Sequence, residues 1–334
     1  MKAIVFEAPE LIECLDREKP VKEEGYVLIK SAFAGICGSD LYIYSGTHPR
    51  AKTGLILGHE FSGTIASENE KFKIGTQVTV NPLIKCGQCS TCIAGLSHVC
   101  ENLRLIGIDS DGGMSEFVKV PIENVYPLPE DMPLKAGALI EPVAVTVHAI
   151  RQGQYTPGDS VVIFGAGTIG ICLALTLRNF GATNITIVEP NEYRQSHASN
   201  LGFNTINPKK ESVKDVIEAG TNGIGADFVF DCAGHPSVLK DIIDITKIKG
   251  KIIIVAAYKK PGEVNLLQSM FKELSIQFVR VYTDRDFQLA LEIVSRNPEY
   301  QKVITHELLP ELSKEGFGIL TGKGNAIKVM YTFE

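Results

Sequence analysis

The chain of 334 residues lacks what membrane, secreted and nucleic-acid-binding proteins need. No apolar run approaches the roughly 18 residues of a membrane span. The N-terminal segment carries acidic residues early and has no small-residue cleavage site, so we expect an opening strand and no secretory signal. With 33 basic against 39 acidic residues, a net charge of -6 disfavours nucleic acid and anionic membranes as partners. Repeats, low-complexity segments and long linkers are absent too, which leaves an ordinary globular protein of about two domains.

Cysteine is the first positive signal, with eight in the chain. Without a secretory signal, reduced thiols in the cytoplasm explain them better than disulfides do. Four stand in one short run with the spacing C-x2-C-x2-C-x7-C: Cys86, Cys89, Cys92 and Cys100. Such a run can close a tetrahedral thiolate site around zinc and leaves no position for a substrate. We predict a structural zinc site that pins a long loop, against the alternatives of redox disulfides or a lost site.

A second set of metal ligands is scattered along the first half of the chain. Cys37 in GICGSD offers a thiolate, and His59 in GHEFSG offers an imidazole. A catalytic zinc site needs a third protein ligand and one open position, and either Glu60 or Glu141 must supply the oxygen. Glu141 stands at the junction between the expected domains, where a cleft can hold substrate against a nicotinamide. The alternative is a buried cysteine and a core histidine with no metal role.

The pattern of predicted secondary structure changes after Pro142. The first 140 residues read as short strands separated by Gly and Pro, which suits a partly open β-barrel. From there to about Thr283, five strands alternate with four helices, the last of which is SVLKDIIDITK up to Lys247. This pattern predicts a parallel sheet covered on both faces. The last fifty residues contain a helix and a closing strand, and we expect them to pack on the first domain.

A glycine motif follows the first strand of the alternating region. In the segment GAGTIG, which comprises Gly165, Gly167, Thr168, Ile169 and Gly170, the glycines permit a tight turn, close approach of a pyrophosphate and helix packing. The next strand ends in Glu189, whose carboxylate can accept hydrogen bonds from ribose hydroxyls and would repel a 2′-phosphate. This favours NAD over NADP, although Arg194 could reverse the preference. Arg194 could also sit over the adenine or be solvated.

These motifs carry a family resemblance. CGSD, GHEFSG, the four-cysteine loop, EPVAVTVHA and GAGTIG occur in the order seen in zinc-dependent medium-chain alcohol dehydrogenases, which the chain resembles over essentially its whole length. Glu141-Pro142 is more similar to the polyol branch, which includes sorbitol, idonate, butanediol and threonine dehydrogenases. The segment DCAGHPSVLK resembles bacterial dehydrogenases linked to sugar-acid catabolism.

The resemblance implies a fold of the α/β class with two domains. A GroES-like β-barrel catalytic domain would span residues 1–143 and 284–334, and a doubly wound parallel-sheet (Rossmann) NAD-binding domain residues 144–283. Two zinc ions per chain are implied. The four-cysteine run would hold the structural ion, and the catalytic ion would be surrounded by Cys37, His59, Glu60 and Glu141. Homodimers or homotetramers are usual in the family.

The expected reaction is the reversible oxidation of a secondary alcohol, a polyol or sugar acid, to its ketone. Ser39 would accept the alcohol proton, and Asp40 would fix the tautomer of the His59 ring. Many relatives carry a histidine where this chain has Tyr42. Proton exit must therefore use Tyr42, the nearby His48 or water.

Substrate recognition is expected to involve positive charge. Polyol dehydrogenases often place a substrate-binding arginine at the end of the last parallel strand, where this chain has Arg280. Arg50 and Lys52 could add charge near the cleft mouth or could simply be solvated. The alternatives are a reductase working toward alcohol, an aliphatic alcohol or threonine dehydrogenase, and a catalytically weak regulatory or binding protein that retains the fold.

Overall fold

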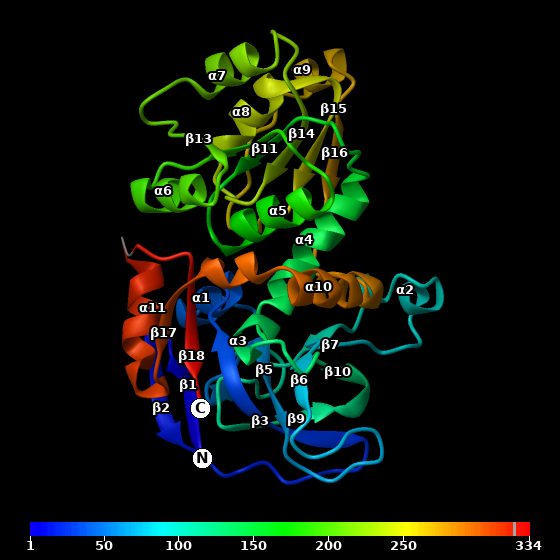
Figure 1. Cartoon of the computed structure of the whole chain (residues 1–334), viewed down its shortest axis with the longest axis vertical. Coiled ribbons are helices and arrows are strands. Elements are labelled where there is room, and N and C mark those ends of the chain that lie inside the picture. The colour runs from blue at the N-terminus through cyan, green and yellow to red at the C-terminus, as the bar shows by residue number, and fades with distance from the viewer. Residues whose placement is uncertain (323–324) are drawn as a thin grey trace. The chain divides into compact units, whose positions relative to one another are not determined.

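The structure, a computed structural model, describes residues 1–322 and 325–334 (Figure 1). It divides into two compact units. Unit 1 is discontinuous and contains Met1–Ala144 and Tyr282–Glu334, whereas unit 2 is the continuous segment Val145–Val281. Within the described ranges, no helix combines the length and apolar character needed to cross a membrane.

Unit 1 is built on sheets whose strands pair antiparallel, except for the parallel pair of the two C-terminal strands. Its largest sheet has the order β10-β6-β5-β3-β18-β17, with β9 also paired to β3. The strands are β3 (Tyr26–Gly35), β5 (Glu60–Ile65), β6 (Gln77–Val80), β9 (Phe117–Pro121), β10 (Val125–Pro127), β17 (Ile304–Leu308) and β18 (Lys328–Thr332). Smaller sheets join β1 (Lys2–Ala8), β2 (Leu11–Asp16) and β4 (Leu55–Ile56), and β7 (Leu83–Ile84) with β8 (Arg104–Leu105). The central strand β3 is buried along most of its length, so it joins sequence-distant segments into one core.

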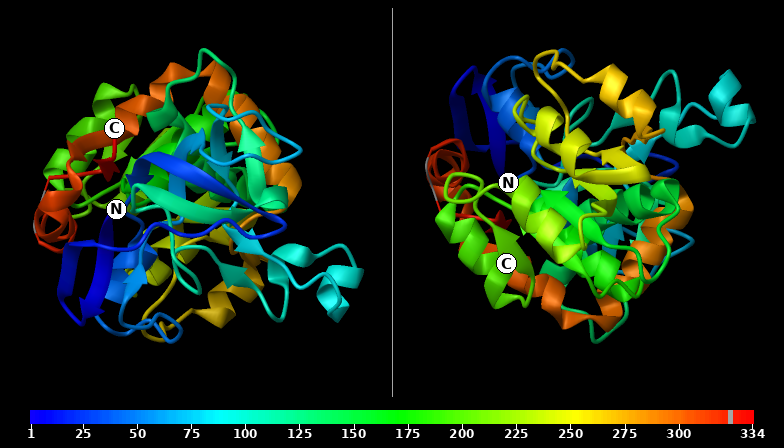
Figure 2. Two further views of the ribbon diagram at one scale, coloured as in Figure 1. Left: turned by 90° about the horizontal axis from the view of Figure 1, so that it is seen from below. Right: turned by 90° about the horizontal axis from the view of Figure 1, so that it is seen from above.

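Short helices connect these strands. They are α1 (Gly38–Tyr44), α2 (Ser90–Ile93), α3 (Leu134–Gly137), α10 (Asp284–Arg296) and α11 (Ser313–Thr321), with 3-10 turns at Ser97–Val99, Ile122–Asn124, Pro298–Val303 and Pro310–Leu312. The loop that carries α2 extends away from the barrel strands (Figure 2). Helix α4 (Ile140–Gly153) contains the boundary between the two units.

Unit 2 is a parallel sheet with helices along its connections. Its strand order is β13-β12-β11-β14-β15-β16, the doubly wound order in which the direction of winding reverses between the first and fourth strands. The strands are β11 (Val161–Phe164), β12 (Ile185–Val188), β13 (Asn204–Ile206), β14 (Ala226–Asp231), β15 (Thr246–Ile254) and β16 (Ser275–Phe278). The helices are α5 (Thr168–Asn179), α6 (Glu192–Asn200), α7 (Val213–Gly220), α8 (Val238–Ile245) and α9 (Leu266–Phe271). This confirms the predicted fold class.

Two details of unit 2 differ from the sequence expectation. Strand β13 was not predicted, because three residues are too few to show a period. A helix was predicted to run to Lys247, but α8 ends at Ile245 and Thr246 already pairs with Ala226 in β15. Apolar residues continue from the end of the helix into the strand, so their periodicity alone does not show where the helix ends and the strand begins.

Candidate active site and metal centres

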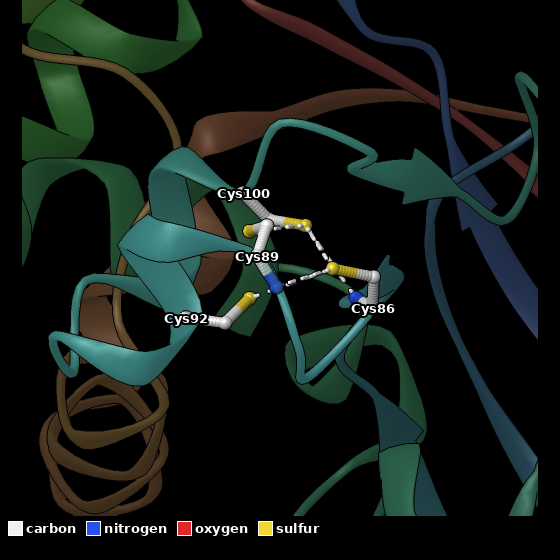
Figure 3. Close-up of side chains that lie close together, drawn as sticks. All are labelled: Cys86, Cys89, Cys92 and Cys100. Atoms are coloured by element: carbon white, nitrogen blue, oxygen red, sulfur yellow. Dashed lines mark hydrogen bonds between the residues drawn. The ribbon is translucent and has the colours of Figure 1, made fainter.

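The four cysteines of the predicted structural site converge at one point in unit 1 (Figure 3). All four are free thiols. The Sγ atom of Cys86 lies 3.5 Å from that of Cys100 and 4.0 Å from that of Cys92, and Cys89 Sγ lies 3.8 Å from Cys100 Sγ. A tetrahedral zinc site with bonds of about 2.3 Å places sulfurs about 3.8 Å apart. The spacing therefore fits zinc and is far too long for disulfides.

Local backbone geometry arranges these thiols. Gly87, with φ +72, turns the chain after Cys86, and Cys89 caps α2. Backbone N–H groups point at sulfur: Cys86 N donates to Cys100 Sγ, and Cys89 N to Cys86 Sγ, both at 3.4 Å. The hydroxyl of Thr91 and nearby amides lower the pKa of Cys89 to about 5. These donors stabilise thiolate, the form that binds metal.

The predicted catalytic ligands also meet in unit 1. Cys37 is the N-cap of α1, His59 follows the tight turn at Gly58, and Glu60 is the first residue of β5. One ligand atom from each of Cys37, His59 and Glu60 lies within 4.8 Å of the others. A Cβ on Gly107 would lie 2.5 Å from the Gly58 carbonyl oxygen and 3.0 Å from His59 N. The loop that contains Gly107 therefore packs closely on the turn that presents His59. The set of sulfur, nitrogen and oxygen donors is one that zinc binds in catalytic sites.

The ring of His59 is buried with unsatisfied polar contacts. Its Nδ1 lies 3.8 Å from Asp40 Oδ1, and neither atom has a hydrogen-bond partner. The other oxygen of Asp40 accepts from Cys37 N at 2.8 Å. Burial alone would lower the pKa of His59, but the Cys37 thiol and the Asp40 and Glu141 carboxyls raise it well above its usual value. A buried imidazole that attracts positive charge so strongly fits a metal ligand, and the role of Asp40 stays a prediction.

Ser39 lies beside this ligand set. Its Oγ is 3.4 Å from His59 Nε2, so the hydroxyl is within hydrogen-bonding reach of the ring. Ser39 reaches this position because it lies in the first turn of α1, two residues after the N-cap Cys37. The structure therefore places the predicted proton acceptor next to the candidate metal site.

Glu141 and Glu60 are each held by a residue that sequence reasoning missed. The hydroxyl of Tyr282 donates to Glu141 Oε1 at 2.9 Å, and Lys328 Nζ forms a buried ion pair with Glu60. Burial raises the pKa of Glu141 to about 7. In the described chain Glu141 does not join the three-ligand group. A lone lysine in the otherwise apolar closing strand was the signal for Lys328, whereas Tyr282 gave none.

The rings of the two candidate relay residues, Tyr42 and His48, pack against each other. Their ring centroids are 5.7 Å apart and the planes meet at 78°. His48 Nδ1 accepts hydrogen bonds from the backbone N–H groups of Arg50 and Ala51, at 3.3 and 3.2 Å. Burial and the charge of Arg50 lower the pKa of His48. The neutral ring then carries its proton on Nε2. Which of the two residues relays a proton stays a prediction.

The glycine motif of unit 2 forms a strand-to-helix turn. Gly165 has φ +97, and a Cβ there would lie 3.2 Å from Ala233 N in the loop after β14. Gly167 caps α5, whose first turn contains Thr168, Ile169 and Gly170, and a Cβ on Gly170 would overlap the Gly165 carbonyl oxygen. The turn thus lies where the winding of the sheet reverses, and it leads into the N-terminus of a helix, as phosphate-binding turns do.

Glu189 connects this turn to the next helix. Its Oε2 accepts from Ala166 N at 2.7 Å and its Oε1 from Asn191 N at 2.8 Å. Each oxygen keeps a second lone pair for a ribose hydroxyl. Arg194 also approaches the turn, since its Nη1 lies 4.0 Å from the point that a Cβ on Gly167 would occupy. Both residues therefore belong to the candidate dinucleotide site.

Arg280 belongs to unit 2. It follows β16 in unit 2 and its side chain is exposed. The candidate metal ligands belong to unit 1. Its predicted contact with substrate stays a prediction.

Two family models match the chain. Residues 23–130 match the alcohol dehydrogenase GroES-like domain, and residues 168–296 match the zinc-binding dehydrogenase model. The first match contains the cysteine cluster and His59, and the second begins at α5.

Similar proteins cover most of the chain. A 2-dehydro-3-deoxy-L-galactonate 5-dehydrogenase of Pseudoalteromonas atlantica is 35% identical over 277 residues, which are 82% of this chain and 81% of that protein. An L-threonine 3-dehydrogenase of Bacillus subtilis is 33% identical over 315 residues, 91% of this chain and 90% of that protein. The crystal structure of an alcohol dehydrogenase of Escherichia coli CFT073 with NADH is 30% identical, with a TM-score of 0.91 over 100% of this chain and 99% of that one.

Proposed function

Because the chain belongs to the polyol branch of the zinc-dependent medium-chain alcohol dehydrogenases, we propose that it interconverts a secondary alcohol and its ketone by hydride transfer with NAD. The observation that carries this proposal is the convergence of Cys37, His59 and Glu60 beside the hydroxyl of Ser39. A zinc ion bound there would act as a Lewis acid toward the substrate oxygen.

Each residue around the ligand set has a role in handling protons. Ser39 Oγ accepts the proton of the substrate hydroxyl as it passes its own proton outward, toward Tyr42, His48 or water. Glu141, with a pKa of about 7 and fixed by the hydroxyl of Tyr282, keeps a carboxyl group near the ligands. A nicotinamide would supply the hydride acceptor.

The choice of NAD is supported by Glu189. Its buried carboxylate lies between the glycine turn and α6, where a 2′-phosphate would bring a second negative charge. Arg194 lies beside Gly167, where a pyrophosphate would approach the glycine turn. The similar Escherichia coli dehydrogenase was crystallised with NADH.

The substrate is proposed to be a hydroxy acid, such as a sugar acid. The galactonate and threonine named for the two relatives are both carboxylates that bear a secondary hydroxyl. In this chain a cavity of about 470 Å³ is lined by Arg50, Lys52 and Arg104 together with one acid, Asp109. Asp109 is already used by Arg50 at 3.0 Å and by Leu105 N at 2.8 Å. Two positive charges therefore remain in excess beside the loop that packs on the His59 turn.

A substrate panel tests this proposal. We expect NAD reduction to be fastest with hexonates, with kcat/KM for L-galactonate about ten- to a hundredfold above that for 2-propanol, because a charge-assisted hydrogen bond is worth about 1.5–3 kcal/mol. The rates are measured with NAD and NADP for L-galactonate, L-threonine, sorbitol, 2,3-butanediol and 2-propanol.

Each other result of the panel would indicate a different substrate, cofactor or function. A preference for 2-propanol or L-threonine would replace the sugar acid by an aliphatic alcohol or an amino acid. Preference for NADP would show that the Glu189 argument is wrong. A protein that holds two zinc ions and binds NADH but turns over none of these alcohols would be a binding protein with the dehydrogenase fold.

The chain is also proposed to form a homodimer through unit 2. Strand β16 is the edge of the parallel sheet, and its outer backbone groups have no partner strand in the described chain. Apolar side chains crowd this edge and the preceding helix α9, with exposed fractions from 60% to 75%: Leu266, Leu267, Met270, Phe271 and Phe278. A second copy can pair its own β16 antiparallel across a two-fold axis and bury both patches.

The dimer can be tested at its most exposed residue. Phe278→Glu is expected to convert a dimer to a monomer, because two carboxylates would face each other in a buried patch. Sedimentation analysis measures the mass at micromolar concentration. Val21→Glu, at a 78% exposed site of unit 1, is the matched control and should leave the mass unchanged. A monomeric wild type would contradict this assembly.

A further inference from the structure

Lys328 is a buried lysine in the candidate metal centre. It is the first residue of β18, its side chain is 1% exposed, and that of Glu60 is 2% exposed. Its Nζ donates to Glu60 Oε2 and to the Ile36 carbonyl oxygen, the latter at 2.9 Å. Lysine is almost never fully buried unless it is paired, and Glu60 is the charged partner that allows Lys328 to be buried here.

The neighbouring backbone is shaped around the pair. Gly35 in β3 lies opposite Met330 of β18. A Cβ on Gly35 would lie 2.5 Å from Lys328 Cε and 2.6 Å from Glu60 Oε2. A side chain at this position would push the ends of Lys328 and Glu60 out of their present places, whereas glycine leaves room for the ion pair as it stands. The arrangement is therefore built by two adjacent strands and not by one flexible side chain.

The charges of the site explain why a cation is useful there. Cys37, Asp40, Glu60 and Glu141 bring four acidic groups to the site, and their full negative charge would exceed the two charges of a divalent metal. The Nζ of Lys328 donates both to Glu60 Oε2 and to the Ile36 carbonyl oxygen, so this basic group is held against a ligand of the set. Lys328 thus opposes part of the negative charge of the ligand set.

We propose that Lys328 is a positioning residue that occupies one oxygen of Glu60, so that Glu60 offers a metal ion only its other oxygen. This inference rests on the proposed function, because it concerns the same metal site. Without the lysine, both oxygens of Glu60 are free to bind the metal, and the position needed by the substrate closes. The neutralising charge also weakens Glu60 as a ligand.

Removal of the lysine charge should make the metal-free protein less stable but should make the site hold zinc more tightly. In Lys328→Met the metal-free protein should lose about 5–10 °C in Tm, because Glu60 is left buried and unpaired. The zinc-loaded variant should regain most of this loss. Zinc release from the site into a chelator should be at least about tenfold slower, because a neighbouring positive charge has been removed. kcat should fall because Glu60 competes with the substrate.

The experiment compares the wild type, Lys328→Met, Glu60→Gln and the double variant Glu60→Gln/Lys328→Met, each as the full chain. Tm is measured with and without zinc, and zinc release is followed by chelator absorbance. In Glu60→Gln, Lys328 keeps an unpaired charge next to the metal, so zinc should leave faster than from the double variant, whose two neutral groups match in charge. This pair of variants gives an answer even if Lys328→Met does not fold.

A purely structural lysine gives a different pattern. Lys328→Met would then lower Tm equally with and without zinc and would release zinc as fast as the wild type or faster. Equal release from Glu60→Gln and the double variant would also overturn the proposal. A wild type that holds only the four-cysteine zinc would instead contradict the proposed function, because no metal would be present at Cys37 and His59.

Discussion

Ser39→Ala is expected to reduce kcat by about 10²–10³-fold with little change in NADH binding or zinc content. Ser39 Oγ lies 3.4 Å from His59 Nε2, which puts its hydroxyl beside the candidate metal site. Asp40 cannot replace it, because one of its oxygens accepts from Cys37 N and the other faces His59 Nδ1. Steady-state kinetics, fluorescence titration with NADH and elemental analysis measure the three quantities.

The same helix offers a control for this prediction. Ser45 is the C-cap of α1 and is exposed, and its hydroxyl bonds with the Tyr42 carbonyl and the Thr47 hydroxyl. Ser45→Ala should keep the wild-type kcat. Ser39→Thr retains a hydroxyl and should restore part of the activity. If Ser39→Ala turned over at the wild-type rate, proton transfer would have to start elsewhere.

Cys86→Ser is expected to lower the zinc content from two ions per chain to one and to lower Tm by at least about 10 °C. Its sulfur contacts those of Cys92 and Cys100 and accepts from Cys89 N, so it touches each of the other three cysteines (Figure 3). A serine hydroxyl does not ionise at neutral pH and cannot replace a thiolate ligand. The loop that carries α2 would then lose the contact that fixes it.

Cys14 provides the control for this variant. It lies in β2, and no metal-binding group in the described residues includes it. Cys14→Ser should keep two zinc ions and a Tm close to that of the wild type. Full zinc retention in Cys86→Ser, measured by elemental analysis of the purified protein, would remove the structural zinc assignment.

Residues whose roles depend on neighbours in sequence could be predicted without the structure. The glycines at 165, 167 and 170 lie within one strand-to-helix turn, and the four cysteines lie within one loop. Their spacing determines their geometry. The sheet of unit 2 was predictable for the same reason, because each strand and helix has its own period, whereas the three-residue β13 has none.

Residues that act through distant partners could not be predicted. Glu60 pairs with a lysine 268 positions away, and Glu141 bonds to a tyrosine 141 positions away. No spacing rule connects such positions, since strand order decides which of them meet. The sequence left Glu60 and Glu141 as equal candidates for the oxygen ligand. The pairing of β5 with β3, which sets Glu60 opposite Gly35, brings Glu60 into the group with Cys37 and His59.

The order of synthesis gives the two units different histories. Unit 2 is one continuous segment, so the whole dinucleotide-binding sheet can leave the ribosome and fold while the rest of the chain is still being made. The large sheet of unit 1 lacks β17 and β18 until translation reaches residues 304–332, and β18 pairs directly with the central strand β3. A nascent chain therefore has its glycine turn well before it has the lysine that completes the metal centre, and its first 144 residues must wait with an unpaired edge on β3.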